Sequence, residues 1–540
     1  MSETTQRIAQ GYAFDGPALE LGTVVHNGQV DPQARVRIPL EMLNRHGLIA
    51  GATGTGKTKT LQLLAEQLSA AGVAVFAPDI KSDLSGLLTA GESNDKIAQR
   101  VTDTGDSTWT PTAYPTEFFA LGGVRTGTPL RATVTSFGPI LLAKVLGLND
   151  TQESALSLVF HWADTNGLAL LDLADLRAVI GYLTSEEGGK QLKELGGVAK
   201  STAGVILREI SELVAQGAED FFGEPEFDTA DLLRRTEDGD NPGRGFINLL
   251  ELADLQNRPA LFSTFLMWLL ADLYEELPEV GDLDKPKLVF FLDEAHLLFD
   301  DASPAFLKAV TQTVRLIRSK GVGVFFVTQR PADLPEAVLA QLGNRVQHAL
   351  RAYTPADADA LRKTVRTYPI TEDYDLEQAL TQLGTGEAVV TVLSEQGAPT
   401  PVAWCRMPAP RSQMAPAPAQ AVQAAITGSV LHARYAQEVD RESAYERLSA
   451  KVHGTADEAD QTDQADQTDQ ADQIDQAVQP DRGSKPAPDR EPARRGRTRE
   501  PKAEPTIVEQ IVASGAFKSF LRSAGSAIGR RMFGTARRRR

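Results

Sequence analysis

Gly51-Ala-Thr-Gly-Thr-Gly56-Lys57-Thr58 follows the apolar run Leu48-Ile-Ala50 and precedes leucines at helical spacing, Leu61, Leu64 and Leu68. The stretch fits the pattern G-x-x-x-x-G-K-[ST], which requires a strand before it and a helix after it. Its glycines let backbone N–H groups close around phosphate oxygens, and the helix N-terminus adds a favourable dipole. The sequence therefore predicts a phosphate-binding P-loop; a flexible Gly/Thr turn is the alternative.

Two residues of this loop carry side-chain chemistry. Lys57 is placed to neutralise the β- and γ-phosphates of a nucleotide, and Thr58 to put its hydroxyl on Mg²⁺. The other positions contribute backbone N–H groups: Gly51, Ala52, Thr53, Gly54, Thr55 and Gly56. The predicted cofactors are therefore ATP and Mg²⁺.

A second element, Lys287-Leu-Val-Phe-Phe-Leu-Asp293-Glu294, is typical of a buried strand that ends in two acids. Asp293 is predicted to hold the metal, and Glu294 to polarise the attacking water as a general base. Two acids in tandem favour ATP hydrolysis over transfer to another substrate, whereas two solvated acids are the alternative. His296 completes the letters Asp-Glu-Ala-His, but we expect it to be a packing or supporting residue.

A third buried strand, Val322-Gly-Val-Phe-Phe-Val-Thr328, ends at Gln329, which we predict to sense the γ-phosphate and orient the water. Arg315 and Arg318 lie three residues apart on a helix and therefore share a face. In a ring, Arg318 can reach the γ-phosphate of a neighbouring subunit; a solvated or salt-bridged helix face is the alternative. Weaker candidates follow later in the chain: Arg345 and Arg351.

Short β-branched and aromatic runs alternate with helical patterns along the body of the chain, which predicts an α/β fold with a mostly parallel sheet. The predicted strands are Leu48–Ala50, Val73–Ala77, Leu288–Leu292, Val322–Val327, Val346–Arg351 and Ala388–Leu393. The residues between two of these strands are too many for one crossover, so we expect a helical insertion at about 90–284. Polar residues after the second strand either line the nucleotide or the pore, or make a turn: Asp79, Lys81 and Asp83.

Composition limits the class of protein. The chain has 540 residues, with 55 Lys and Arg against 72 Asp and Glu, and a net charge of −17. Its one cysteine, Cys405, has no partner for an internal disulfide and is expected to be a buried inert thiol. There is no basic start followed by an apolar run and no apolar stretch long enough to span a bilayer. We therefore expect a cytoplasmic protein.

The C-terminal part changes in composition. A helical extension is predicted at 408–453, followed at 454–505 by an acidic Asp-Gln repeat and a basic, Pro-rich stretch, neither of which can bury a core. The segment 506–540 has apolar residues near helical spacing among Lys and Arg. We predict a disordered tail that ends in a basic amphipathic helix, able to bind DNA phosphate, a partner or, less favoured, a membrane surface.

Three motifs were described above: the glycine-rich loop, the strand that ends in Asp293 and Glu294, and the strand that ends at Gln329. Together they resemble the HerA/FtsK class of RecA-like (ASCE) P-loop ATPases, and most closely its bacterial HerA-like, YjgR-like branch. The resemblance runs through Val36–Thr58, Leu288–His296 and Gly321–Pro335 and implies an ATPase domain at 46–407. It implies the roles given above for the loop, Asp293, Glu294 and Gln329, and an arginine finger at Arg318.

The resemblance also implies a homo-oligomeric, hexameric ring that passes duplex DNA through its pore as a translocase or helicase. HerA carries an N-terminal β-barrel that docks a nuclease, and the short segment 1–45 is too small for that barrel. A nuclease partner is therefore not expected. The competing hypothesis is an ATP-gated scaffold that binds a protein partner with slow turnover and no translocation. A motor for conjugative transfer, similar to VirB4, is a third and less attractive possibility.

Overall fold

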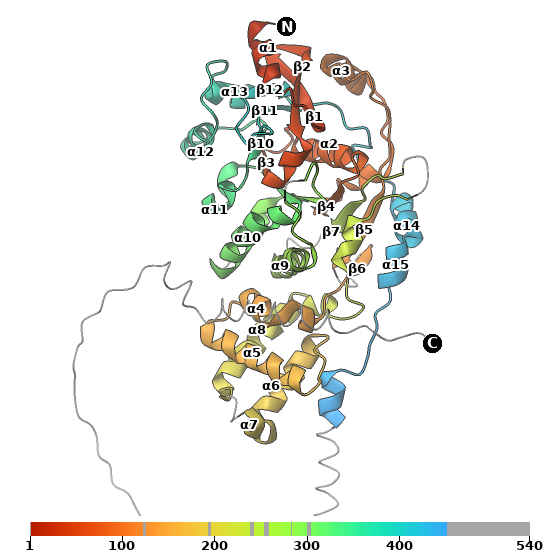
Figure 1. Cartoon of the computed structure of the whole chain (residues 1–540), viewed down its shortest axis with the longest axis vertical. Helices are drawn as coiled ribbons and strands as arrows, with labels where there is room; N and C mark the ends of the chain where they lie inside the picture. Colours follow the sequence, from red (N-terminus) through yellow and green to blue (C-terminus); the bar gives the residue numbers. More distant parts are fainter. Residues whose placement is uncertain are drawn as a thin grey trace, which may run out of the picture. The chain divides into compact units, whose positions relative to one another are not determined.

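The computed structural model describes residues 2–121, 126–192, 196–237, 242–252, 259–281, 283–299 and 304–450, all within one compact unit. The predicted acidic repeat and the predicted amphipathic helix lie outside these described residues. Within them, twelve strands form one sheet in the order β2-β1-β12-β11-β10-β3-β9-β8-β4-β7-β5-β6 (Figure 1). The predicted α/β fold with a mostly parallel sheet is confirmed.

Eight neighbouring strands of this sheet run parallel. They are β10 (Asn344–Gln347), β3 (Gly47–Ala50), β9 (Val322–Thr328), β8 (Leu288–Leu292), β4 (Ala74–Asp79), β7 (Ile247–Glu251), β5 (Thr116–Leu121) and β6 (Thr128–Leu130). The other four form an antiparallel edge. They are β11 (Glu387–Thr391), β12 (Ala403–Arg406), β1 (Ala18–His26) and β2 (Gln29–Pro39), with α1 (Glu3–Gln10) packed on the last two.

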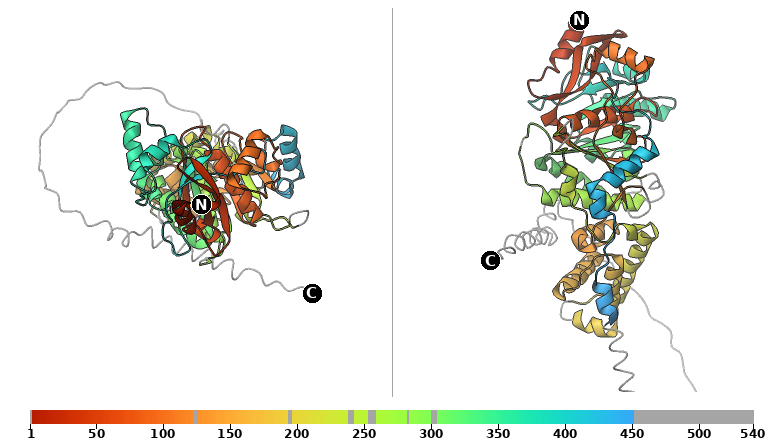
Figure 2. Two further views of the ribbon diagram at one scale, coloured as in Figure 1. Left: turned by 90° about the horizontal axis from the view of Figure 1, so that it is seen from above. Right: turned by 90° about the vertical axis from the view of Figure 1, so that its right-hand side faces the viewer.

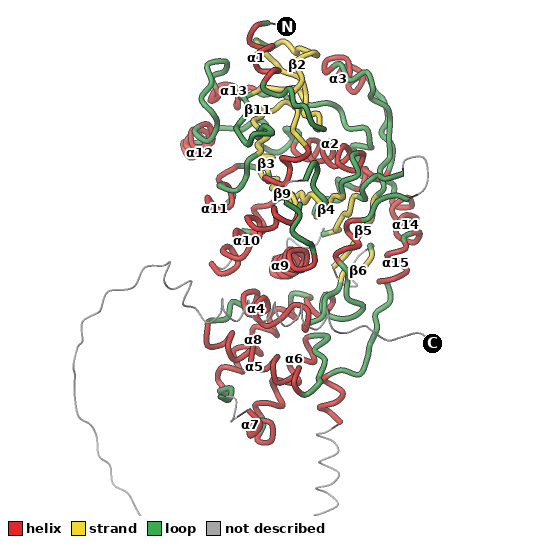
Figure 3. Tube along the Cα trace, viewed as in Figure 1, coloured by secondary structure: helices red, strands yellow, loops and turns green. Residues whose placement is uncertain are grey.

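The central strands are buried on both faces, which explains their unbroken apolar sequences. Successive residues of a strand point to opposite faces, so Phe290 belongs to one core and Phe291 to the other. One core also contains α9 (Pro259–Glu276) and α10 (Pro304–Ile317). The other contains α2 (Lys57–Ala70), so helices cover both sides of the strands (Figure 3).

A group of helices is inserted between β6 and β7. It consists of α4 (Val134–Val145), α5 (Asp150–Thr165), α6 (Leu173–Thr184), α7 (Glu186–Leu192) and α8 (Lys200–Ala215). The region predicted as a helical insertion, about 90–284, also supplies strands β5, β6 and β7 to the sheet, as well as α3 (Asp95–Thr104). The prediction did not include these three strands, because they are short and lie between helical patterns.

After β12 the chain returns along the β5 and β6 side of the sheet through α14 (Ala419–Gly428) and α15 (Val430–Tyr435). It then reaches the inserted helices (Figure 2, right). There the N–H of Tyr445 donates to Asp175 Oδ1 at 2.8 Å. The remaining helices are α11 (Glu336–Leu339), α12 (Pro355–Val365) and α13 (Leu376–Gln382). Cys405 is buried, as expected. Within the described part of the chain, no helix is both long and apolar enough to cross a membrane.

Candidate nucleotide-binding site

The glycine-rich loop joins β3 to α2 at the carboxyl end of the parallel strands. Gly51, Gly54 and Gly56 have φ angles of 154°, 77° and 123°, a region that favours glycine. A Cβ on Gly51 would lie 2.5 Å from the Cβ of His348, so this position also lacks space for a side chain. The loop therefore holds its shape only with glycine at these positions.

Helix α2 begins without a side-chain cap. Its N-cap is Gly56, whereas Asn149 and Thr354 cap α5 and α12 with complete capping boxes. The first N–H groups of an α-helix have no partner within the helix and carry a partial positive charge. The first turn of α2 is thus suited to an anion.

Lys57 is the first residue of α2 and is buried. Its Nζ donates to the carbonyl oxygens of Gly51 at 2.6 Å and Ala52 at 3.2 Å. Burial lowers the pKa of Lys57, although the nearby Glu294 and Asp293 oppose that effect. The ammonium group therefore bonds to its own loop at the point where phosphate oxygens would enter.

The two acids after β8 lie beside this lysine. Burial raises the pKa of Asp293, whose Oδ1 accepts the N–H of Glu294 at 2.9 Å. Glu294 has a left-handed backbone, with a φ of 47°, which is strained for a residue with a side chain. This conformation turns the chain sharply at the end of the strand.

The carboxylate of Glu294 contacts two further side chains. Its Oε1 forms an ion pair with the Nζ of Lys81, and its Oε2 lies 3.4 Å from the Nδ1 of His296. Burial alone would raise the pKa of Glu294, but the hydrogen bond and charge of Lys81 lower it below its usual value. Lys81 was predicted only as one of several polar groups near the loop, and its pairing was missed.

Two other predicted residues lie at the same edge of the sheet. Thr58 is the second residue of α2 and is partly exposed. Gln329 is exposed and directly follows β9, whose last residue, Thr328, accepts the N–H of Gly51 at 3.2 Å. The backbone therefore brings Gln329 to the border of the loop, and its sensing role stays a prediction.

Arg318 lies at the opposite end of the strands. It is exposed, precedes β9, and its charge acts on His46, which directly precedes β3. A strand of seven residues such as β9 spans about 20 Å, so Arg318 cannot reach the loop of its own chain.

The weaker arginine candidates have local contacts. Arg345 donates to the carbonyl of Thr367 at 3.3 Å, and Arg351 to the hydroxyl of Tyr353 at 3.0 Å. Arg315 lies in α10, three residues before Arg318, and is exposed. No contact in the described residues ties these three to the loop.

A buried histidine supports the loop and was missed by sequence reasoning. Nε2 of His348 lies 2.8 Å from the hydroxyl of Thr60 in α2, and Nδ1 lies 2.8 Å from the carbonyl oxygen of Glu387. Burial lowers the pKa of His348 to about 4. The ring is therefore neutral, with its Nδ1–H donating to the Glu387 carbonyl and Nε2 accepting from Thr60. The position of His348 just after β10 was the available signal.

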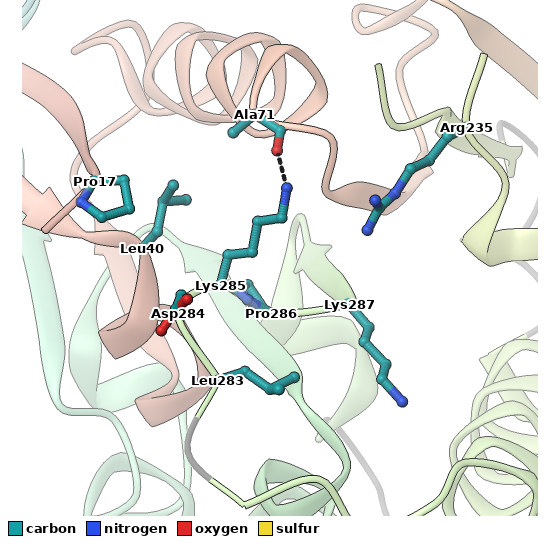
Figure 4. Close-up of a pocket in the computed structure, with 9 residues that line it drawn as sticks. All are labelled: Pro17, Leu40, Ala71, Arg235, Leu283, Asp284, Lys285, Pro286 and Lys287. Atoms are coloured by element: carbon teal, nitrogen blue, oxygen red, sulfur yellow. Dashed lines mark hydrogen bonds between the residues drawn. The ribbon is translucent and has the colours of Figure 1, made fainter. Parts of the chain in front are cut away.

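An open cavity of about 610 Å³ lies at the far end of α2 from the loop (Figure 4). Lys285 Nζ donates there to the carbonyl of Ala71 at 2.7 Å. The cavity is lined by Pro17, Leu40, Ala71, Arg235, Leu283, Asp284, Lys285, Pro286 and Lys287. The cavity contains none of the predicted chemical residues, so it is separate from the candidate site.

The sequence matches the family described as "Helicase HerA-like C-terminal" over residues 25–540. The chain belongs to this family. A curated relative, the DNA double-strand break repair helicase HerA of Sulfurisphaera tokodaii, is 24% identical over 380 residues, which cover 68% of this chain and 66% of that protein. A probable helicase of Methanocaldococcus jannaschii is 32% identical over 154 residues, which cover 27% of this chain and 28% of that protein. This HerA-like chain thus spans less than two thirds of either relative.

Solved structures include similar chains. The bacterial conjugative coupling protein TrwB aligns with a TM-score of 0.49 and 14% identity, covering 76% of this chain and 94% of that chain. VirB4 of Thermoanaerobacter pseudethanolicus aligns with a TM-score of 0.42 and 16% identity, covering 73% of this chain and 97% of that chain. The predicted resemblance to HerA-like P-loop proteins is confirmed by the family match, while the roles of individual residues stay predictions.

Proposed function

We propose that this HerA-like chain is a Mg²⁺-dependent ATP hydrolase that assembles as a ring and moves along DNA. The observation that carries this proposal is the meeting of Lys57, Asp293 and Glu294 at the carboxyl end of the sheet, beside an uncapped helix. This is the set of groups needed to bind a triphosphate and hydrolyse it.

The residues present fit both ATP and Mg²⁺. The loop is open at Gly54, where an added Cβ would meet no atom within 4 Å, and the first turn of α2 has no side-chain cap. Asp293 and Thr58 offer carboxylate and hydroxyl oxygens, the donors that Mg²⁺ prefers. When bound with ATP, the ion would neutralise charge on the phosphates.

The remaining residues act on water and charge. Glu294 accepts a proton from the attacking water as the general base, and Gln329 orients that water from the end of the neighbouring strand. Lys57 exchanges its two loop carbonyls for phosphate oxygens and neutralises the charge that develops on them. Tandem acids and a buried lysine thus favour hydrolysis.

The position of Arg318 supports assembly into a ring. Because Arg318 lies one strand length from the loop of its own chain, it can contribute to hydrolysis only at the loop of another chain. A closed ring gives every subunit both a loop and a neighbour's arginine. We propose a hexamer, with duplex DNA as the substrate that passes through it.

Steady-state ATP hydrolysis at low salt, with and without duplex and single-stranded DNA, tests this function, with Glu294→Gln as the blank. Duplex is expected to stimulate turnover several-fold. Turnover at the level of the blank with ATP still bound would contradict the translocase and favour an ATP-gated scaffold. Stimulation by single strands alone would contradict the duplex assignment.

A further inference from the structure

The ion pair between Lys81 and Glu294 has an outer and an inner member. The side chain of Lys81 is 48% exposed, whereas that of Glu294 is 10% exposed. An anion that approaches from solvent therefore meets the lysine before the carboxylate. Nothing in the ATPase scheme above uses Lys81, although it is the residue that makes an ion pair with the proposed base.

The backbone that carries Lys81 is firmly tied. The carboxylate of Asp79 accepts the N–H groups of Asp83 at 3.1 Å and Leu84 at 2.8 Å. The next residue, Ser82, has a φ of 56° and donates its hydroxyl to Glu251 Oε2 at 3.0 Å. The turn after β4 is therefore fixed, and only the long side chain of Lys81 is free to change partner.

The acid is also presented from a strained backbone. Glu294 and Ser82 both have left-handed φ angles without being glycine, and they follow the neighbouring parallel strands β8 and β4. Strained residues persist where the surrounding structure fixes them, and they gather at active sites and switches. The turns that carry these two residues are joined by the ion pair between Lys81 and Glu294.

We propose that Lys81 is a positioning residue that holds Glu294 in a resting arrangement, and that a phosphodiester backbone releases the base by drawing Lys81 away. This inference rests on the proposed function, in which Glu294 activates water. While Lys81 bonds to Oε1, that oxygen is occupied and is not available to the attacking water. Competition by backbone phosphates for the exposed ammonium frees the oxygen, so turnover rises when DNA is bound.

The first test compares ATP turnover of Lys81→Met, Lys81→Arg and the wild-type protein, each with and without duplex DNA. Lys81→Met is expected to raise the rate without DNA about three- to fivefold, as expected for loss of a partly exposed ion pair. The rate with DNA and the KM for ATP should change little, so DNA stimulation shrinks. Lys81→Arg should restore the stimulation.

Lys96→Met is the matched control, because Lys96 is an exposed lysine on α3 with no part in the site. It should leave both rates unchanged. Equal loss of both rates in Lys81→Met would overturn the proposal, because Lys81 would then support catalysis in every state. A rise without DNA in Lys96→Met as large as in Lys81→Met would also overturn it, as a general charge effect.

The second test needs no turnover. Thermal unfolding of Lys81→Met, Glu294→Gln and the double variant should show non-additive shifts in Tm, because the two residues form one pair. Additive shifts would overturn the proposal directly. If wild-type protein and Lys81→Met both lack turnover while the shifts are coupled, the ATPase function fails and the regulatory role fails with it. Normal wild-type turnover with no rise in Lys81→Met refutes the role of Lys81 alone.

Discussion

The two ends of the parallel strands differ in what they contain. The carboxyl end has glycines with positive φ angles, an uncapped helix and the buried charges Lys57 and Glu294. The amino end has the exposed Arg318 and the open cavity beside Lys285. Each end also has a buried histidine near its cation, His348 by Lys57 and His46 by Arg318.

Under the proposed function, this difference means that one chain contains the two halves of a reaction centre at opposite ends of its strands. The carboxyl end can bind and activate, but the arginine that would stabilise transition-state charge is placed at the other end. In the proposed ring, the amino end of one subunit would stack against the carboxyl end of the next and bring both halves together. Such a heterologous contact closes into a ring when the rotation allows it.

The largest expected effect is a fall in ATP turnover when Arg318, the cation at the amino end of the strands, is removed. Arg318→Ala should lower DNA-stimulated turnover about a thousandfold, because a finger of this kind is worth that much or more. ATP affinity should change little. Turnover and nucleotide binding measured side by side check this. Arg315→Ala is the matched control, because Arg315 is an exposed arginine in α10, whereas Arg318 lies in the 3-10 turn that follows this helix.

Mixing Arg318→Ala with Lys57→Ala subunits tests whether the amino end of one subunit serves the carboxyl end of another. One variant keeps an intact carboxyl end and the other an intact amino end, so mixed rings should recover part of the activity. Assembly is confirmed by mass photometry. Absence of recovery at every ratio would show that the two ends do not serve each other.

At the carboxyl end, Glu294→Gln should lower turnover about a hundredfold or more, the usual contribution of a general base. ATP should still bind, because Gln keeps the shape of the side chain and Lys57 remains. Rapid-quench turnover together with equilibrium binding of a fluorescent ATP analogue separates the two effects. Unchanged turnover would remove Glu294 from the proposed role.

Lys57→Ala should weaken ATP binding about a hundredfold, through loss of charge-assisted bonds to phosphate. The folded state should tolerate the change, because the carbonyls of Gly51 and Ala52 can bond to water instead. Isothermal titration with ATP checks the affinity, and Lys59→Ala, two residues further along α2, is the control. A similar loss in both variants would point to general charge rather than to the loop.

The sequence predicted the central part of the sheet because β8 and β9 are buried on both faces and read as unbroken apolar runs. It misplaced β10, predicted at Val346–Arg351 and found at Asn344–Gln347, because this strand begins and ends with buried polar residues. The side-chain Nδ2 of Asn344 donates hydrogen bonds to the carbonyl oxygens of Met42 and His46, both at 2.9 Å. No local pattern signals such a partnership.

The difference between local patterns and contacts across the chain also explains which site residues were found and which were missed. The loop and the tandem acids are contiguous motifs, so the local sequence is sufficient to identify them. Lys81 pairs with Glu294 across 213 residues, and His348 contacts Thr60 across 288. Such contacts follow from strand order, which places β4 beside β8 and β10 beside β3. Strand order was not readable from the sequence.

The smallest expected effect concerns the two buried histidines, whose pKa values are both lowered from 6.5 to about 4 by burial. Below pH 6.5 the unfolded chain takes up protons that the folded chain does not, so stability is complete above that pH and falls towards pH 4. Each histidine should cost about 1–2 kcal/mol at pH 5. Thermal unfolding between pH 7 and pH 5 measures the slope.

The two ends should contribute separately to this slope. His348→Gln and His46→Gln are each expected to start less stable at pH 7, since His348 bonds to Thr60 and His46 Nδ1 accepts the N–H of Val324 at 3.0 Å. Each should then lose less stability towards pH 5, because a neutral amide takes up no proton. If only His348→Gln flattens the slope, the histidine at the carboxyl end accounts for the pH dependence. A slope unchanged in both variants would contradict the burial of neutral rings at either end.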